Sequence, residues 1–366
     1  MTTCVHLIAA ARPNFMKVAP LYHALAAEVW CARVLVHTGQ HYDPQMSDAF
    51  FVDLDLPVPD IHLGVGSGSH AEQTAGVMLA YEKACLAQRP DLVIVAGDVN
   101  STLACTVTAK KMGLQVAHLE AGLRSGDRTM PEEINRIVTD TLADILWTPS
   151  PDADANLRRE GVDANRIQRV GNIMIDSFEL QRKHIEARQI AARLALPPGG
   201  YGVVTMHRPS NVDDPAALAG LVESLRRVAS LIPLVFVVHP RTRERLRSWG
   251  MDDRLAACEG LSLLEPLGYI DFMSLVTSAR LVITDSGGVQ EETTYLGIPC
   301  LTVRSTTERP ITVTEGTNRL VSVSALEQTV TDLLRVARRE VRRPELWDGR
   351  TASRIVALLR ARYAHA

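Results

Sequence analysis

Residues 92–119, LVIVAGDVNSTLACTVTAKKMGLQVAHL, carry the pattern that decides the fold. An apolar run at Leu92–Ala96 is followed by helix-like sequence and then by a second apolar run at Val116–Leu119. Both runs are apolar on both faces, which fits strands of a parallel sheet covered by helices on each side. The stretch therefore predicts a βαβ unit.

The same alternation extends over the rest of the chain. Apolar runs at Val5–Ala9 and Val34–His37 precede the quoted stretch, so the first half is predicted to be a doubly wound domain. The pattern starts again after Gly171 and Asn172, where a long charged helix is expected over 176–194. Strands are then expected at Val203–Met206, Leu234–Val238, Leu281–Thr284 and Cys300–Val303. We predict an N-terminal domain over 1–172, a second α/β domain over 173–349 and an amphipathic helix over 350–363.

Composition is that of a globular enzyme. The 366 residues are 46% hydrophobic and 22% charged, which is enough apolar sequence for sizeable cores. Lys and Arg number 39 against 42 Asp and Glu, a formal net charge of −3, so no nucleic acid or anionic membrane partner is expected. The six cysteines have no paired spacing and are expected to be buried, reduced thiols. No signal peptide or membrane span is recognised, so we expect a cytoplasmic location.

Polar residues follow the expected strands of the first half, where α/β domains present ligands. Arg12 and Lys17 follow the first strand and are placed to bind an anion, although Arg12 could instead cap the turn. Asp98 could be a helix N-cap, but Ser101 and Thr102 compete for that role, which leaves the Asp98 carboxylate for chemistry. The sequence thus predicts a charged sheet edge.

Further carboxylates lie at the end of the second run and in the helix after it. Strand alternation puts His118 and Glu120 on one side, and a buried charged Glu is costly unless it is used or paired. With Asp98 they could suggest a metal site, but no paired-ligand spacing supports one, so no metal is expected. Glu132 and Arg136 are i, i+4 partners, and a surface ion pair would explain them equally well.

Two loops of the second half combine histidine with arginine. His207 and Arg208 follow one expected strand, and His239 and Arg241 follow the next. A single His is more often structural than catalytic, but four such groups on adjacent loops favour anion binding.

A glycine-rich turn gives the most informative signal. Residues 285–288, Asp-Ser-Gly-Gly, lead from a strand into a helix. Glycine lets phosphate oxygens approach the backbone, and the helix N-terminus supplies N–H groups, so the turn predicts a diphosphate cradle. It lacks the GxGxxG spacing and the P-loop lysine. Glu292 lies one turn further on, where it could accept hydrogen bonds from ribose, and Arg309 adds a cation.

In this order the motifs resemble the non-hydrolysing UDP-N-acetylglucosamine 2-epimerases over nearly the whole chain. The matching segments are Arg12–Lys17, Gly97-Asp98, His118–Arg124, Pro131–Arg136, His207-Arg208, Asp285–Glu292 and Thr307–Pro310. The resemblance implies a GT-B type fold, with two Rossmann-like domains, the active site in the cleft between them and a C-terminal helix over 350–366 that rejoins the first domain. It also implies reversible inversion at carbon 2, through loss of UDP to a 2-acetamidoglucal and its re-addition. A homodimer that needs no cofactor is expected.

The resemblance also assigns roles to residues. The catalytic set is Asp98, Glu120, Glu132 and His207, and which carboxylate is acid or base stays open because coupled carboxylates titrate as a set. The UDP-binding set is Arg12, Lys17, Arg136, Phe272, Ser286, Gly287, Gly288, Glu292 and Arg309. A second, allosteric substrate site would use Gln40, His41, Arg208 and His239. Asp43 and the Ala71-Glu72 pair depart from the pattern of that site, so substrate activation is not expected.

Other readings of the motifs remain. A UDP-sugar carrying a uronic acid or a second acetamido group could be the substrate instead. A GT-B glycosyltransferase would share the fold but would not need three carboxylates at the sugar. A hydrolysing epimerase usually departs from the Arg12-Pro13 form, and a nucleotide-sugar sensor would not need the carboxylates.

Overall fold

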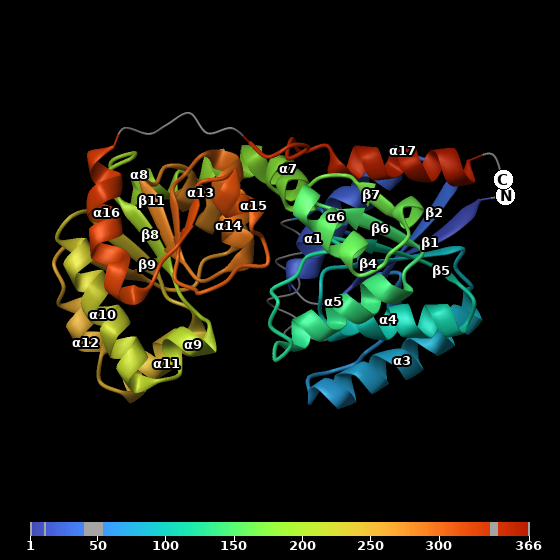
Figure 1. Cartoon of the computed structure of the whole chain (residues 1–366), viewed down its shortest axis with the longest axis horizontal. Helices are drawn as coiled ribbons and strands as arrows, with labels where there is room; N and C mark the ends of the chain where they lie inside the picture. Colours follow the sequence, from blue (N-terminus) through green and yellow to red (C-terminus); the bar gives the residue numbers. More distant parts are fainter. Residues whose placement is uncertain (1, 11, 40–53, 337–342, 365–366) are drawn as a thin grey trace. The chain divides into compact units, whose positions relative to one another are not determined.

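The chain forms two α/β units, each built on one parallel sheet (Figure 1). The computed structural model describes residues 2–10, 12–39, 54–336 and 343–364. Unit 1 comprises Met1–Gln181 and Glu345–Ala366, and unit 2 comprises Arg182–Pro344. All strand pairings within both sheets are parallel, which confirms the predicted class of two doubly wound α/β domains. The domain boundary expected at 172/173 coincides with the start of helix α7 (Ile173–Arg188). The division between the two units falls within this helix, after Gln181.

The sheet of unit 1 has seven strands in the order β3-β2-β1-β4-β5-β6-β7. Because the strands are parallel, the loops after them emerge at the same edge of the sheet. The strand order reverses between β1 and β4, and such folds bind ligands at this point of that edge. The sequence predicted four of these strands and did not identify β3, β6 and β7. The bounds are β1 Thr3–Ala9, β2 Cys31–His37, β3 Ile61–His62, β4 Leu92–Ala96, β5 Gln115–Leu119, β6 Ile145–Thr148 and β7 Ile167–Arg169.

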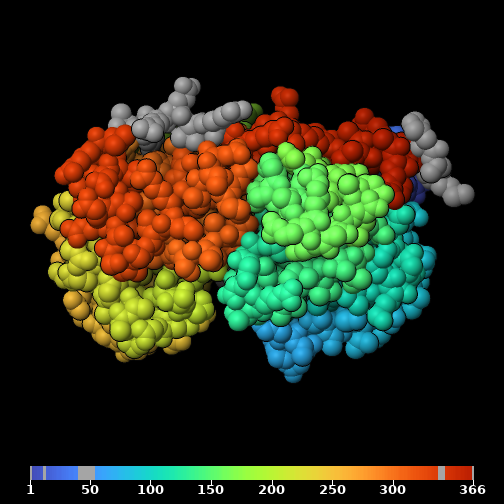
Figure 2. All heavy atoms as spheres, in the orientation of Figure 1, coloured from blue at the N-terminus to red at the C-terminus, as the bar shows by residue number. Residues whose placement is uncertain are grey.

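Helices cover both faces of this sheet (Figure 1). On one face α3, α4 and α5 pack together, and on the other the C-terminal helix α17 packs against α1. Trp347, just before α17, donates its indole N–H to the Pro149 carbonyl at 3.0 Å, and in Figure 2 the red C-terminal segment borders the green segment after β6. The bounds are α1 Arg12–Leu25, α3 His70–Ala87, α4 Asn100–Lys111, α5 Pro131–Leu142, α6 Pro151–Arg159 and α17 Thr351–Tyr363.

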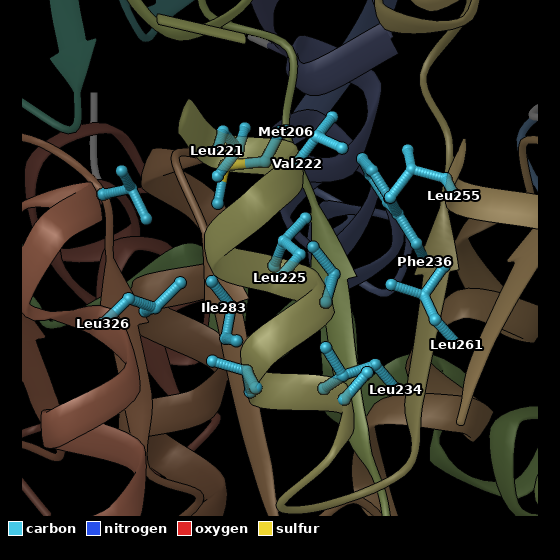
Figure 3. Close-up of a cluster of buried hydrophobic side chains, with 14 of the residues drawn as sticks. Met206, Leu221, Val222, Leu225, Leu234, Phe236, Leu255, Leu261, Ile283 and Leu326 are labelled. Atoms are coloured by element: carbon cyan, nitrogen blue, oxygen red, sulfur yellow. The ribbon is translucent and has the colours of Figure 1, made fainter. Parts of the chain in front are cut away.

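The sheet of unit 2 has six strands in the order β10-β9-β8-β11-β12-β13. Its core lies between the sheet and the apolar face of α10, where Leu221 and Leu225 pack with Phe236 and Ile283 (Figure 3). The strands are β8 Gly202–Thr205, β9 Leu234–Val237, β10 Leu261–Leu264, β11 Leu281–Thr284, β12 Cys300–Thr302 and β13 Asn318–Leu320. The helices are α8 Ile190–Arg193, α9 Pro209–Val212, α10 Pro215–Ala229, α11 Pro240–Ser248, α12 Asp252–Ala256, α13 Tyr269–Thr277, α14 Gly287–Leu296, α15 Ile311–Thr314 and α16 Leu326–Arg335.

Two expectations from the sequence need correction. The single helix expected over 176–194 is two helices, α7 and α8, because Gln189 between them has a left-handed backbone with φ of 49°. All six cysteines are free thiols, but only Cys85, Cys105 and Cys300 are buried, while the other three are half-buried. Among the residues that the structure describes, no helix is long and apolar enough to span a bilayer.

Candidate functional site

The loop after β4 presents Asp98, and α5 holds it in place. Arg136 of α5 forms an ion pair with the Asp98 carboxylate, and its Nη2 lies 2.8 Å from Oε2 of Glu133. The side-chain amide of Asn135 donates to the Asp98 carbonyl at 2.9 Å. The Asp98 side chain is nevertheless 30% exposed. Both its backbone and its carboxylate are therefore fixed while the carboxylate stays accessible.

The structure tests the local partners that the sequence offered for these groups. Val99 occupies the N-cap of α4 without a side-chain hydrogen bond, and Thr102 instead donates its hydroxyl to the Ala96 carbonyl at 2.9 Å. Thus neither Ser101 nor Thr102 caps the helix, and Asp98 does not cap it either. Arg136 uses its guanidinium on Asp98 and Glu133, so the alternative reading of an i, i+4 pair with Glu132 is not what the structure shows.

Glu132 is the exposed carboxylate of this region. It lies in the first turn of α5, where the helix dipole favours a negative charge. No hydrogen bond or ion pair of Glu132 is found among the described residues. Its side chain is therefore available for a ligand.

Glu120 at the end of β5 forms a buried ion pair with Lys17 of α1. Glu120 has a left-handed backbone with φ of 77°, and its N–H donates to the Trp147 carbonyl at 3.1 Å. Gly97, with φ of 66°, lies against this pair, since a Cβ there would be 2.7 Å from Nζ of Lys17. The predicted buried Glu is thus paired, and the predicted anion-binding Lys17 already has a carboxylate partner.

His118 is also engaged in hydrogen bonds. Its ring is fully buried, with Nδ1 2.6 Å from Oδ1 of Asp140 and Nε2 2.8 Å from the Gly97 carbonyl. Asp140 escaped the sequence analysis because nothing in its local sequence marks it. Within the described ranges, no group of three or more His, Cys, Asp or Glu side chains is arranged to hold a metal ion.

In unit 2, buried Asp285 at the end of β11 organises the loop after β8. Its carboxylate accepts hydrogen bonds from the backbone N–H groups of His207 and Arg208 and from the Asn211 amide. The His207 ring lies with Nδ1 2.9 Å from the same carboxylate and is 38% exposed. Burial alone would raise the pKa of Asp285, but these hydrogen bonds hold it below its usual value. Asp285 was quoted in the sequence only as part of the glycine-rich turn.

The neighbouring cations have carboxylate partners. Nη2 of Arg208 lies 3.3 Å from Oε1 of Glu308, and Arg304 also pairs with Glu308. Against the effect of burial, Arg304 and Arg309 hold the pKa of Glu308 well below its usual range. His239 is the N-cap of α11 and its ring lies 5.4 Å, centroid to centroid, from that of His207. The structure therefore brings the rings of His207 and His239 together, whereas Arg241, the fourth group expected on these loops, is paired with Asp213.

The glycine-rich turn forms the start of α14. Ser286 is the N-cap residue and makes no side-chain cap hydrogen bond to the described helix. Arg309 lies over this turn, since a Cβ on Gly287 would be 2.9 Å from its Nη1, whereas a Cβ on Gly288 would meet nothing within 4 Å. Nε of Arg309 also lies 2.8 Å from Oε1 of Glu291. The arrangement offers helix-end N–H groups and a guanidinium to an anion.

Glu292 lies one turn further along α14, close to Tyr269 and Glu291. Its side chain is buried, and burial raises its pKa to about 8, with the nearby Glu291 charge acting in the same direction. Tyr269 of α13 is the neighbour that opposes this shift. Phe272 follows on α13 and is half-buried. Glu292 is therefore poised to change charge near neutral pH.

Several predicted residues lie outside what the structure covers. Gln40 and His41 of the expected second site are outside the described residues. Arg12 is the first residue of α1, but its side chain is also outside them. Glu72, which departs from the second-site pattern, has a structural role, because it forms a capping box with Ser69 at the start of α3.

Known proteins identify the family. Residues 23–360 match the sequence profile of UDP-N-acetylglucosamine 2-epimerase. A UDP-N-acetylglucosamine 2-epimerase of Methanocaldococcus jannaschii is 40% identical over 86% of this chain and 87% of its own. A UDP-2,3-diacetamido-2,3-dideoxy-D-glucuronate 2-epimerase of Pseudomonas aeruginosa is 39% identical over 87% of this chain and 88% of its own.

A solved structure extends this likeness to the fold. The crystal structure of the M. jannaschii UDP-GlcNAc 2-epimerase in complex with UDP-GlcNAc and UDP matches with a TM-score of 0.89. It is 38% identical and covers 98% of this chain and 100% of its own. The chain belongs to the UDP-N-acetylglucosamine 2-epimerase family and is an epimerase that acts at carbon 2 of its sugar.

Proposed function

We propose that this chain interconverts UDP-N-acetylglucosamine and UDP-N-acetylmannosamine by eliminating UDP and adding it back. A base removes the proton of carbon 2 while the bond from carbon 1 to the diphosphate oxygen breaks. The electron pair of the C–H bond forms the C1–C2 double bond, and UDP leaves with the electrons of the C–O bond. The reverse step delivers a proton to the opposite face of carbon 2 as UDP bonds again to carbon 1.

The observation that carries this proposal is the set of carboxylates in unit 1. Asp98 is accessible, Glu132 is exposed, and Glu120 is paired with Lys17 in the interior. A proton with no neighbouring carbonyl to acidify it needs a base on one face and an acid on the other. Three carboxylates with such different surroundings can divide these tasks.

Unit 2 supplies the groups suited to UDP. The start of α14 and Arg309 offer N–H groups to the diphosphate, and they would stabilise the negative charge that develops as UDP leaves. His207, oriented by Asp285, assists at the diphosphate. Glu292 would accept hydrogen bonds from ribose, and Phe272 would pack beside the uracil. We propose that these groups and the carboxylates of unit 1 act on the same UDP-sugar.

A modified UDP-sugar is the second candidate substrate. The specific observation in its favour is the P. aeruginosa relative, whose named substrate is a diacetamido uronate and whose identity, 39%, nearly equals the 40% of the M. jannaschii relative. The proposed chemistry at carbon 2 is the same for both sugars.

Proton NMR of the purified protein with UDP-N-acetylglucosamine in heavy water tests the proposal. We expect the UDP-linked manno epimer to form with deuterium at carbon 2. Release of free N-acetylmannosamine would instead identify a hydrolysing enzyme. Exchange seen only with the diacetamido uronate would reassign the substrate, and tight UDP binding without exchange on either sugar would reject the mechanism.

The proposal also includes the homodimer and the cytoplasmic location expected from the family resemblance. Sedimentation equilibrium of the full chain tests the first, with twice the chain mass of 40.1 kDa as the expected result. Cell fractionation with an antibody to the chain tests the second.

A further inference from the structure

A buried charged network lies beneath the two strand ends that carry Asp98 and Glu120. At its centre, His118 of β5 bridges Asp140 of α5, at 2.6 Å, and the Gly97 carbonyl, at 2.8 Å. The side chains of His118 and Asp140 are 0% and 1% exposed. Neither residue was assigned a role in the reaction above.

The two acceptors fix the protonation state of His118. A carbonyl oxygen can only accept, so Nε2 carries a proton toward Gly97. The other acceptor is Asp140, whose Oδ2 accepts from the Gly122 N–H at 3.0 Å and from Arg124 at 2.7 Å. The ion pair with Arg124 favours the carboxylate form of Asp140. Nδ1 of His118 therefore carries a proton as well. With both nitrogens donating, the ring is an imidazolium paired with a buried carboxylate.

The charges around Asp140 agree with an imidazolium ring at His118. Burial alone would raise the pKa of Asp140, but His118 and Arg124 together lower it. Arg124 in turn donates from Nε and Nη2 to the Glu160 carboxylate. The cations facing Asp140 are thus His118 and Arg124 at its carboxylate and Arg166 at its backbone carbonyl.

One end of the network fixes the backbone before Asp98. The Gly97 N–H donates to the Leu119 carbonyl at 3.1 Å, and the Gly97 carbonyl accepts from His118. Gly97 has φ of 66°, and a Cβ there would collide with Lys17. The peptide that leads into Asp98 is therefore held on both sides.

The other end fixes the turn after Glu120. Asp140 accepts from the N–H of Gly122, whose φ is 82° and where a Cβ would lie 2.5 Å from the Ala153 carbonyl. Glu120 itself has the left-handed φ of 77°. A non-glycine residue persists in that conformation only when its surroundings hold it there.

We propose that His118 and Asp140 form a charged positioning pair, in which the His118 imidazolium fixes the peptide before Asp98 and the Asp140 carboxylate fixes the turn after Glu120. The catalytic consequence rests on the proposed function, because it requires Asp98 and Glu120 to act on the sugar. Whether the ion pair between His118 and Asp140 exists does not depend on the proposed function.

NMR of protein labelled with ¹⁵N-histidine tests the pair directly. At neutral pH, one ring is expected to show a proton on both nitrogens, because each nitrogen faces an acceptor. This signal should be absent from His118→Gln, and Asp140→Asn should remove it as well, because the carboxylate that accepts from Nδ1 is gone. A wild-type spectrum in which every histidine is neutral at that pH would overturn the proposal, whether or not the protein epimerises UDP-N-acetylglucosamine.

Kinetics of Asp140→Asn test the positioning role. Misplacing the carboxylates should lower kcat on the order of 100-fold, while KM and the Kd for UDP stay within about twofold. The matched control is Asp154→Asn, which removes another buried carboxylate of unit 1, one that pairs with Arg169 at 2.8 Å. The control should lower Tm similarly and keep kcat within about twofold of wild type.

Equal losses of kcat in Asp140→Asn and Asp154→Asn would reduce the network to a structural one and overturn its role in positioning. If the wild-type protein fails to epimerise any UDP-sugar tested, the proposed function fails by itself. The NMR result then still decides whether the charged pair exists.

Discussion

Nδ1 of His207 lies 2.9 Å from Oδ1 of Asp285, and this carboxylate is fully buried. Because the carboxylate accepts, Nδ1 carries the proton of a neutral His207 ring, and Nε2 is left for the ligand. The backbone N–H groups of His207 and Arg208 donate to the same carboxylate. Asp285 therefore sets both the tautomer of the ring and the path of its loop.

We expect Asp285→Asn to lower kcat by at least about tenfold, because the amide can present an N–H toward the ring and disturb the tautomer. Replacing a buried acceptor of several hydrogen bonds should also cost about 1–3 kcal/mol of unfolding free energy. Steady-state kinetics and thermal unfolding measure the two effects. Asp214→Ala is the control, since Asp214 caps α10 by accepting from Ala217 and its loss should cost about 1 kcal/mol without lowering kcat. An unchanged kcat in Asp285→Asn would remove His207 orientation from the mechanism.

Neighbouring glutamates on α5 should separate catalysis from stability. Glu132 is exposed, whereas buried Glu133 accepts from the N–H groups of Ser125 and Gly126 and pairs with Arg136. We expect Glu132→Gln to lower kcat about 100-fold or more and to leave Tm and the Kd for UDP unchanged. Glu133→Gln should instead lower the unfolding free energy by about 1–3 kcal/mol. A wild-type rate in Glu132→Gln would exclude Glu132 from proton transfer.

Gly288→Ala should stabilise the protein and weaken UDP binding. A Cβ at this helical position meets nothing within 4 Å, so the fold gains the advantage of Ala over Gly, up to about 1 kcal/mol. The same methyl group would occupy the space that a phosphate oxygen needs. Gly220→Ala in α10 is the matched control, because Gly220 also has open space around its Cβ position. Calorimetric titration with UDP decides the point: equal affinity in both variants would argue against a diphosphate at this turn.

Sequence patterns predicted the central strands well and the partners of side chains poorly. The bounds of β4 and β11 agree with the apolar runs at Leu92–Ala96 and Leu281–Thr284, because central strands of a parallel sheet are apolar on both faces. The outer strands β3 and β7 are short, with two and three residues, and carry no such run. Local periodicity therefore identified the central strands and missed the short edge strands, and it also missed β6, which lies inside the sheet.

The candidate site shows the same limit. Spacing within α5 suggested that Arg136 pairs with Glu132, but the carboxylate it contacts, Asp98, lies 38 residues away. Asp140 of α5 was missed because its partners are distant in the sequence: His118 lies on β5 and Arg124 in the loop after β5. Such partners are set by tertiary packing, which leaves no periodic signal in the sequence.

Substrate dependence should be hyperbolic. Of the residues expected at a second site, Arg208 is paired with Glu308, and Glu72 at a mismatched position is used in the capping box of α3. Initial rates measured over a wide range of UDP-N-acetylglucosamine should fit a single site in both the presence and the absence of UDP. A sigmoidal curve would show that substrate activates the enzyme and would restore the second site.

Glu292 should make both stability and UDP affinity depend on pH. Its pKa is raised by burial from an ordinary 4.5 to about 8, so near neutral pH it is protonated in the folded chain and ionised in the unfolded one. Its contribution to stability is therefore fully present below about pH 4.5 and is lost as pH rises through about 8. Glu292→Gln cannot ionise and should lack this loss. Urea unfolding of both proteins across that range measures the difference.

The affinity for UDP should change with pH in the opposite direction to stability. Ribose hydroxyls donate hydrogen bonds and so favour the ionised carboxylate, which means that UDP should bind more tightly as pH rises toward about 8 and should release a proton on binding near neutral pH. Calorimetric titration in two buffers of different ionisation enthalpy counts that proton. Glu292→Gln should bind UDP more weakly at high pH and release no proton. If the wild-type protein and Glu292→Gln release the same number of protons, the ribose does not bind to Glu292.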